Sequence, residues 1–353
     1  IRPRDWSSDV CSSDLHMNNS FSPSHETTRL GIMHLKRYWE KQQAIRNGIL
    51  NNTDLSEEWQ LDYTLLVALG LGLEQTICYL YTNETSLSKF EDWILDLNGG
   101  SIPEEQIRQF NRYILRQDEP EKRTVEQVLS EEELGFWEEN GYLIVRGAIS
   151  KADCEAAVKV ICDFIAADLA RPETWYTPNP AKQGVMVQLF QHPVLEQNRR
   201  SPKVRKVYEQ LWNRTDLWLN TDRCGFNPPV TVSHAYQGFP LHWDVSLKQP
   251  IPFGLQGILY LTDTAENQGA FTLVPGFHRK IEAWLNELPE GENPRNQDFD
   301  ALGAKPIAAE AGDFIIWHHA LPHGSSPNLA HLPRIVQYIN YSPIDLEIKK
   351  EWI

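Results

Sequence analysis

The first third of the chain carries apolar residues at helical spacing. In four segments, large apolar side chains recur every three or four residues, which places them along one face of a helix. The pair Gly99-Gly100, shortly after the third segment, is typical of a helix end. We therefore predict an all-helical domain over residues 17–123. Its helical segments are expected at residues 30–39, 59–66, 90–97 and 107–114.

The sequence of this helical part shows no cluster of histidine, cysteine and carboxylate residues typical of a catalytic site. We expect an accessory domain, or one through which the chain forms a homo-oligomer. Docking of a substrate or of a carrier protein is the alternative role.

The pattern changes after a charged segment, residues 117–123, which we interpret as a linker. An amphipathic helix is expected at residues 151–169, and from about residue 185 short apolar runs alternate with Pro and Gly. Short strands without helical crossovers are typical of an antiparallel sandwich or barrel. We predict that residues 124–353 form a mainly β domain with a double-stranded β-helix (jelly-roll, cupin-like) core, flanked by helices. Strands are expected at residues 142–146, 185–190, 230–236, 255–261, 270–274, 314–317 and 335–341.

The first sixteen residues differ from the rest of the chain. Residues 1–16 (IRPRDWSSDVCSSDLH) are rich in Ser and Asp and have no apolar period. They resemble sequencing-adapter DNA that has been translated by mistake, so we expect a non-native leader and a true start at Met17. The alternative is a disordered tail, and neither interpretation gives the segment a function.

Composition excludes several classes of partner. The chain has 33 Lys+Arg and 48 Asp+Glu, a net charge of −15, which argues against nucleic acid or an anionic membrane as the main partner. The most apolar stretch, residues 63–73, has about half the ~20 residues that cross a bilayer. The 5 cysteines are scattered without a Cys-x-x-Cys pair, which suits a reducing compartment and a cytoplasmic protein.

Two short stretches carry candidate chemistry. His242-Trp243-Asp244 is the only His-x-Asp in the sequence, and in a strand its first and third side chains would point to one face. The second stretch, residues 312–328, contains three histidines that compete as a third ligand. Two imidazoles and one carboxylate on one face of an octahedral ion are the signature of non-haem Fe(II) oxygenases. The competing histidines are His318, His319 and His323.

Basic and histidine residues near these stretches have their own interpretations. Arg334 begins the last predicted strand, where its guanidinium could bind a carboxylate through two hydrogen bonds. His234, eight residues before His242, is expected to be a core histidine. The basic run at residues 199–206 is interpreted as a solvated helix face.

From about residue 129 to the C-terminus, the chain resembles the phytanoyl-CoA dioxygenase family of Fe(II)- and 2-oxoglutarate-dependent oxygenases. Residues 129–147 (LSEEELGFWEENGYLIVRG) are similar to the N-terminal signature of that family. Residues 266–270 (ENQGA) and 275–278 (PGFH) resemble two later motifs. Several ordered motifs are a stronger signal than a single His-x-Asp.

The resemblance implies specific roles for four residues. His242, Asp244 and His323 match the iron ligands of the family. Arg334 matches the arginine that pairs with the distal carboxylate of 2-oxoglutarate.

Three further positions bear on this match. His278 corresponds to a motif histidine that is not a ligand, so we interpret it as structural. Phe277 stands where the family usually has Ser. Val336 stands where a Ser often assists the same carboxylate, which leaves the detail of cosubstrate binding open.

The resemblance implies a dioxygenase that uses Fe(II), 2-oxoglutarate and O2. We expect it to hydroxylate an unactivated C–H bond of a small natural-product, amino-acid or acyl-type substrate, with release of succinate and CO2. Asp244 favours hydroxylation over halogenation, because related halogenases have a small residue at that position. Desaturation, epimerisation and ring formation are alternatives with the same cofactors. A non-catalytic binding or regulatory protein and a hydrolytic zinc site are the alternatives from other classes.

Overall fold

The computed structural model describes residues 21–50, 58–117, 124–349, 351 and 353. The expected leader and most of the expected linker lie outside the described residues. The chain divides into two compact units, which we describe separately. Residues up to 119, except 70–75, belong to the first unit, and residues 70–75 and 120–353 belong to the second.

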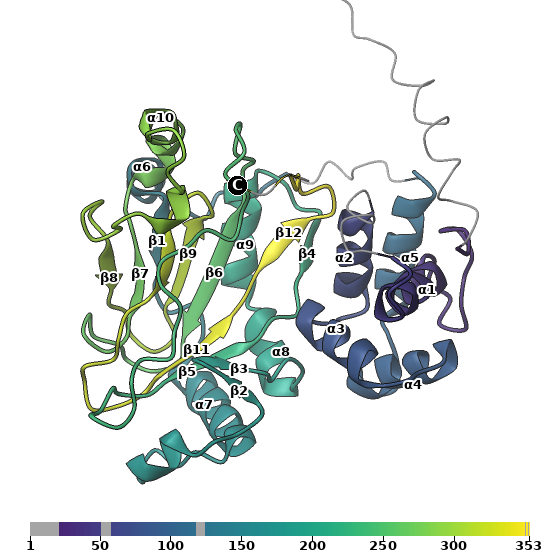
Figure 1. Cartoon of the computed structure of the whole chain (residues 1–353), viewed down its shortest axis with the longest axis horizontal. Helices are drawn as coiled ribbons and strands as arrows, with labels where there is room; N and C mark the ends of the chain where they lie inside the picture. The colour runs from purple at the N-terminus through teal and green to yellow at the C-terminus, as the bar shows by residue number, and fades with distance from the viewer. Residues whose placement is uncertain (1–20, 51–57, 118–123, 350, 352) are drawn as a thin grey trace, which may run out of the picture. The chain divides into compact units, whose positions relative to one another are not determined.

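The first unit is built from helices (Figure 1). Helix α4 begins after Ser86, whose hydroxyl accepts a hydrogen bond from the Lys89 backbone, and it ends before Gly99 and Gly100, which both have positive φ. One helix, α3, was not predicted, since Thr, Ile and Tyr residues lower its intrinsic propensity. The helices are α1 (Leu35–Arg46), α2 (Trp59–Ala68), α3 (Leu73–Thr82, which begins in the second unit), α4 (Leu87–Leu97) and α5 (Glu104–Ile114).

No single helix among the described residues is long and apolar enough to cross a membrane. Helices α2 and α3 reach the required length and composition only when counted together, and they are bent by 97° relative to one another.

The second unit contains antiparallel sheets (Figure 1). The largest has seven strands in the order β1-β9-β6-β11-β5-β3-β2, a second has the order β10-β7-β8, and β12 pairs with β4. The strands are β1 (Tyr142–Val145), β2 (Lys182–Gln183), β3 (Met186–Val187), β4 (Leu217–Leu219), β5 (Cys224–Asn227), β6 (Leu255–Tyr260), β7 (Phe271–Leu273), β8 (Lys305–Ile307), β9 (Phe314–His318), β10 (His323–Ser325), β11 (Arg334–Tyr338) and β12 (Tyr341–Pro343).

Alternation along the strands separates two cores on the faces of the large sheet. In β9, Phe314 and Ile316 belong to one core, whereas Ile315 and Trp317 belong to the other. The first core is covered by helices, and the second by the small sheet, whose Phe271 packs against Trp317. The covering helices are α7 (Lys151–Ile165), α8 (Pro193–Arg199) and α9 (Pro202–Trp212).

Sequence signals placed several of these elements correctly. The predicted strands at residues 142–146, 255–261, 270–274 and 314–317 form as β1, β6, β7 and β9. The stretch 335–341 is divided into β11 and β12, and only Met186–Val187 of the stretch 185–190 is a strand. The remaining helices are α6 (Glu131–Asn140), α10 (Ile281–Glu287) and the 3₁₀ segments Pro172–Tyr176, Phe277–Arg279 and Pro294–Asn296.

The predicted strand at residues 230–236 was wrong. Thr231 and His234 exchange backbone hydrogen bonds in a tight turn, and the Thr231 and Ser233 hydroxyls bond the His234 ring. Such local bonds compete with a sheet ladder. His234 is exposed and stacks on Tyr176 at 4.1 Å, so the expected core histidine was also wrong.

The basic run at residues 199–206 is not wholly solvated. Arg199 is fully buried, and its guanidinium donates to the backbone oxygens of Phe190 and Asp222. Arg199 therefore stabilises the fold, and the predicted solvated face was wrong for this residue.

Candidate metal centre

Two histidines far apart in sequence are joined through their backbones. His323 begins β10, and the backbone nitrogens of His242 and His323 each donate to the oxygen of the other at 2.9 Å. This bridge is isolated, so His242 does not lie in a longer strand. It holds the two imidazole rings with their centroids 5.0 Å apart.

Asp244 reaches the same place from an irregular segment. We predicted that alternation in a strand would align His242 with Asp244, but residues 243–254 form no strand. Pro250 and Pro252 lack the N–H groups that a sheet ladder needs. Trp243 still points away from the site, because its indole is buried and donates to the Ala320 oxygen at 2.9 Å.

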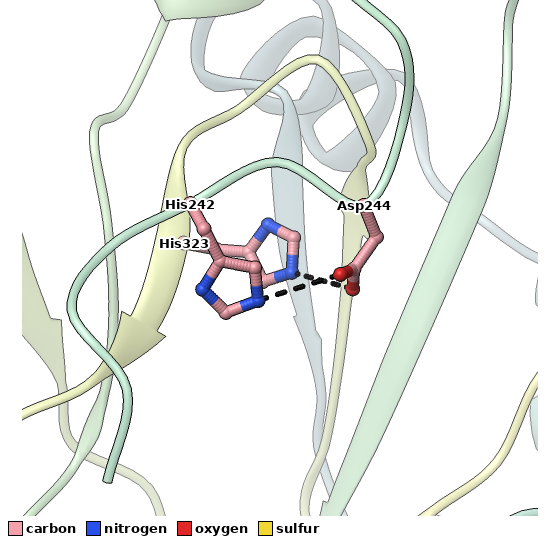
Figure 2. A group of neighbouring side chains, drawn as sticks. All are labelled: His242, Asp244 and His323. Carbon is pink, nitrogen blue, oxygen red and sulfur yellow. Dashed lines mark hydrogen bonds and ion pairs between the residues drawn. The ribbon is translucent and has the colours of Figure 1, made fainter. Parts of the chain in front are cut away.

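The ring nitrogens have distinct roles. Nδ1 of His242 faces the Pro240 oxygen at 2.9 Å, and Nδ1 of His323 faces the Leu321 oxygen at 3.0 Å. Because a carbonyl only accepts, each Nδ1 carries a proton, so in its neutral form each ring would offer the Nε2 lone pair to a metal ion. Both Nε2 atoms point at the Asp244 carboxylate, at 3.4 Å from His242 and 3.3 Å from His323 (Figure 2).

The electrostatics of this group favour positive charge beside Asp244. Burial would raise the pKa of Asp244, but hydrogen bonds from His242 and His323 outweigh it and hold the pKa well below its usual range. The pKa of His242 is raised, chiefly by its hydrogen bond to Asp244. Two lone pairs and a carboxylate that converge in this way need either protons or a metal ion between them.

The three side chains open into a cavity of about 510 Å³. Their ligand atoms lie within 4.8 Å of one another, and N,N,O donor sets suit first-row transition metals with open coordination positions. The volume falls in the range of small-molecule sites. Phe271, Trp317 and Tyr338 line the cavity beside them.

The side chains of the other two candidate histidines make hydrogen bonds away from Asp244. Nδ1 of His318 accepts from the Ala320 backbone at 3.0 Å, and burial lowers its pKa to about 3. Nε2 of His319 faces the Pro252 oxygen, and burial lowers its pKa to about 4. The structure therefore brings His323, rather than these two, to Asp244.

Arg334 is buried on the cavity side of β11. Arg334, Val336 and Tyr338 alternate onto one face of the strand, and Tyr338 lines the cavity. Arg334 is 1 % exposed, and among the residues that the structure describes none of its three guanidinium nitrogens has a hydrogen-bond acceptor. The nearby Tyr260 hydroxyl already donates to the Ile307 oxygen at 2.9 Å. A buried guanidinium without an acceptor fits a carboxylate ligand.

Phe277 and Val336 differ from the family motifs, and the structure shows where these two side chains and the motif histidine His278 lie. Phe277 is buried in the core between the sheets, 6.0 Å from the Trp243 ring. Val336 is fully buried and offers no hydroxyl beside Arg334. His278 lies 5.3 Å from the His318 ring and bonds the Glu138 oxygen, away from Asp244.

Sequence reasoning missed Gln256. This residue lines the cavity and donates from Nε2 to Asp244 Oδ2 at 2.8 Å. The signal was present, because period-two alternation in β6 places the polar Gln256 on the same face as Ile258 and Tyr260.

A second group of potential ligands lies in the helical unit. The structure brings together His34, Glu58 and Asp62, which the sequence did not indicate. The Lys41 ammonium is fully buried among them, 2.7 Å from Glu58 and 2.5 Å from Asp62. An internal cation already balances these carboxylates, so we interpret the group as an ion-pair network.

This chain is similar to several known proteins over part of its length. A "Putative phytanoyl-CoA dioxygenase" of Dictyostelium discoideum is 26% identical over 259 residues, 59% of this chain and 74% of that protein. A peroxisomal phytanoyl-CoA dioxygenase of Bos taurus is 25% identical over 57% of this chain, and the match spans 65% of its own length, just under two thirds. The solved structure of EctD from S. alaskensis with bound Fe has a TM-score of 0.47 and 18% identity, covering 65% of this chain and 85% of that chain.

The family model described as phytanoyl-CoA dioxygenase (PhyH) matches residues 137–336, which is more than half of the chain and includes both halves of the candidate site. The chain therefore belongs to the phytanoyl-CoA dioxygenase family.

Proposed function

We propose that His242, Asp244 and His323 bind Fe(II), and that Arg334 binds the distal carboxylate of 2-oxoglutarate. Family membership makes the chain a non-haem dioxygenase, an oxidoreductase that uses Fe(II), 2-oxoglutarate and O2. The observation that carries the residue assignment is the convergence of two Nε2 lone pairs and one carboxylate on a cavity.

The residues of the chain provide geometry and charge. When bound, Fe(II) and 2-oxoglutarate supply the O2 activation that oxidises a substrate C–H bond and yields succinate and CO2. The Nδ1 contacts of His242 and His323 hold their Nε2 lone pairs toward one point. Arg334 provides the one positive charge that a dicarboxylate needs at its far end. Phe271 and Trp317 provide an apolar wall that excludes water.

We extend the proposal to the fold and the substrate. The facing sheets of the second unit form a double-stranded β-helix core, and residues 17–123 form an accessory helical domain. The substrate is a small molecule that fits a cavity of about 510 Å³, and the reaction is hydroxylation. Arg334 argues against a hydrolytic zinc site. Its buried guanidinium has no hydrogen-bond partner within the described residues, and hydrolysis at a zinc ion would not use it.

The test is anaerobic reconstitution of the whole chain with Fe(II) and 2-oxoglutarate, followed by visible absorption. We expect a charge-transfer band that His323→Ala removes and that Arg334→Met shifts to much higher 2-oxoglutarate concentrations. The matched control is His331→Ala, an exposed histidine outside the site, which should keep the band. Absence of the band in the iron-loaded wild type would reject the assignment and favour a binding protein.

A further inference from the structure

Asp244 depends on one neutral hydrogen-bond donor. Its side chain is 51% exposed and comes from a segment without strand structure. Apart from the two histidine rings, Gln256 is the one side chain within the described residues that donates to it. Once both Nε2 atoms bind a metal, they no longer donate to the carboxylate, so its orientation depends on Gln256.

The orientation of the Gln256 amide follows from chemistry. An ionised carboxylate only accepts hydrogen bonds, so the Gln256 nitrogen, not its oxygen, faces Asp244 Oδ2. Oε1 of Gln256 therefore points away from Asp244. That oxygen is buried and has no hydrogen-bond partner. Buried acceptors are rarely left unpaired.

A matching donor lies directly opposite on the next strand. Gln256 of β6 and Trp317 of β9 are register partners in the antiparallel ladder, and both line the cavity. Side chains at directly opposite positions share a face with Cβ atoms about 5 Å apart. Nε1 of Trp317 is also buried without a partner. An indole N–H only donates and an amide oxygen only accepts, so the two unpaired groups are complementary.

We propose that Trp317, Gln256 and Asp244 form a hydrogen-bond chain that holds the metal-binding carboxylate in one orientation. The link from Gln256 Nε2–H to Asp244 Oδ2 is present in the structure at 2.8 Å. The link from Trp317 Nε1–H to Gln256 Oε1 is the inferred one, since neither atom has a partner among the described residues. Gln256 and Trp317 are positioning residues, since they act through Asp244. The inference rests on the proposed function only in taking Asp244 as a metal ligand.

The test is titration of the metal-free, full-length protein with Co(II), read by its absorption spectrum. Groups that orient a metal ligand typically contribute tenfold or more to metal affinity. We expect Gln256→Met to weaken Co(II) binding about tenfold. Trp317→Phe should weaken it less, because it removes the N–H and keeps the ring against Phe271. In the double variant, Trp317→Phe should add nothing to Gln256→Met, since the chain is already broken.

Two matched controls exclude general effects of these substitutions. Gln188→Met removes an amide that bonds Gln183 and does not contact Asp244. Trp212→Phe, at the end of α9, removes an indole N–H that donates to the backbone oxygen of Tyr341 in β12. Both should keep the Co(II) affinity of the wild type. Thermal unfolding of every variant identifies any loss of fold.

A spectroscopic reading separates positioning from simple packing. With Zn(II) as a diamagnetic probe, the indole N–H resonance of Trp317, assigned through Trp317→Phe, should move on metal binding. In Gln256→Met the movement should be smaller, because only the direct effect of the metal near His323 remains, whose ring lies 5.1 Å from Trp317. The proposed hydrogen-bond chain is overturned if either single variant binds Co(II) as tightly as the wild type. It is also overturned if the losses of affinity from the two single variants multiply in the double variant. If the wild-type protein binds no Co(II), the metal centre itself is rejected, and the hydrogen-bond chain is rejected with it.

Discussion

The backbones of His242 and His323 are joined by two reciprocal hydrogen bonds, each 2.9 Å long. The main chain of both candidate ligands is therefore fixed by this bridge, which holds their ring centroids 5.0 Å apart. Asp244, which has no such bridge, is the ligand whose position depends most on its neighbours. A centre built in this way needs little reorganisation on metal binding.

The histidines of the second stretch should differ sharply in their effect on metal binding. His323→Ala removes a ring nitrogen that faces Asp244 and should abolish tight Co(II) binding. His319→Ala removes a ring that faces the Pro252 oxygen, and should keep one Co(II) per chain. The measurement is equilibrium dialysis with metal analysis. Loss of the metal in His319→Ala, with retention in His323→Ala, would reverse the assignment.

The sequence predicted much of this site, and the misses have physical causes. Short apolar runs between Pro and Gly identified β6, β9 and part of β11, whose apolar side chains are buried in the two cores on either face of the sheet. Alternation wrongly aligned His242 with Asp244 within a strand, since residues 243–254 form no strand. It missed the bridge between His242 and His323, which is a long-range pairing with no local signal.

Gly269, in the predicted Asn-Gln-Gly motif, is expected to be intolerant of a side chain. Its φ is +66°, and an added Cβ would lie 2.2 Å from Asn227 Nδ2. Asn227 is the register partner of Arg334, so the clash would disturb the cosubstrate side of the site. Gly269→Ala should cost more than the ~1–2 kcal/mol of a left-handed conformation alone.

The matched control is Gly303→Ala, which has φ +93° but no atom within 4 Å of the added Cβ. Urea unfolding should show a smaller loss for Gly303→Ala than for Gly269→Ala. Equal losses would mean that the Asn227 contact is relieved by a small movement.

Acid should destabilise the second unit through His318. Burial lowers the pKa of this histidine from 6.5 to about 3, so between these values the unfolded chain binds a proton that the folded chain does not. Stability is therefore complete above pH 6.5 and falls with decreasing pH, by up to about 1.4 kcal/mol per pH unit. His318→Phe suits the apolar surroundings of Trp137 and Phe253 and should remove this part of the slope.

Urea unfolding of wild type and His318→Phe between pH 7.5 and pH 5 measures the difference. The variant should lose about 1 kcal/mol at pH 7.5, because the Ala320 N–H loses its acceptor. It should approach or exceed the wild type at pH 5. Parallel pH profiles for the two proteins would contradict the assigned role of His318.

Arg334 should reduce the stability of the ligand-free protein. Its guanidinium is almost wholly buried, and none of its nitrogens has a hydrogen-bond acceptor within the described part of the chain, so folding removes a charged group from water with little compensation. Methionine has a similar length and no charge. Arg334→Met should therefore stabilise the ligand-free protein by roughly 1–3 kcal/mol, opposite in sign to most substitutions of buried residues.

The same substitution should remove the stabilisation that the cosubstrate provides. With Co(II) present, 2-oxoglutarate at about 100 times its Kd should stabilise the wild type by about 2.7 kcal/mol. Arg334→Met should gain much less from the same concentration, because the buried guanidinium that would bind the distal carboxylate is gone. Thermal unfolding with and without 2-oxoglutarate measures both effects in one experiment. A variant that is less stable than the wild type without ligand, yet still stabilised by 2-oxoglutarate, would show that Arg334 is a structural residue. A gain without ligand that is lost with ligand would show that stability was given up for binding at this position.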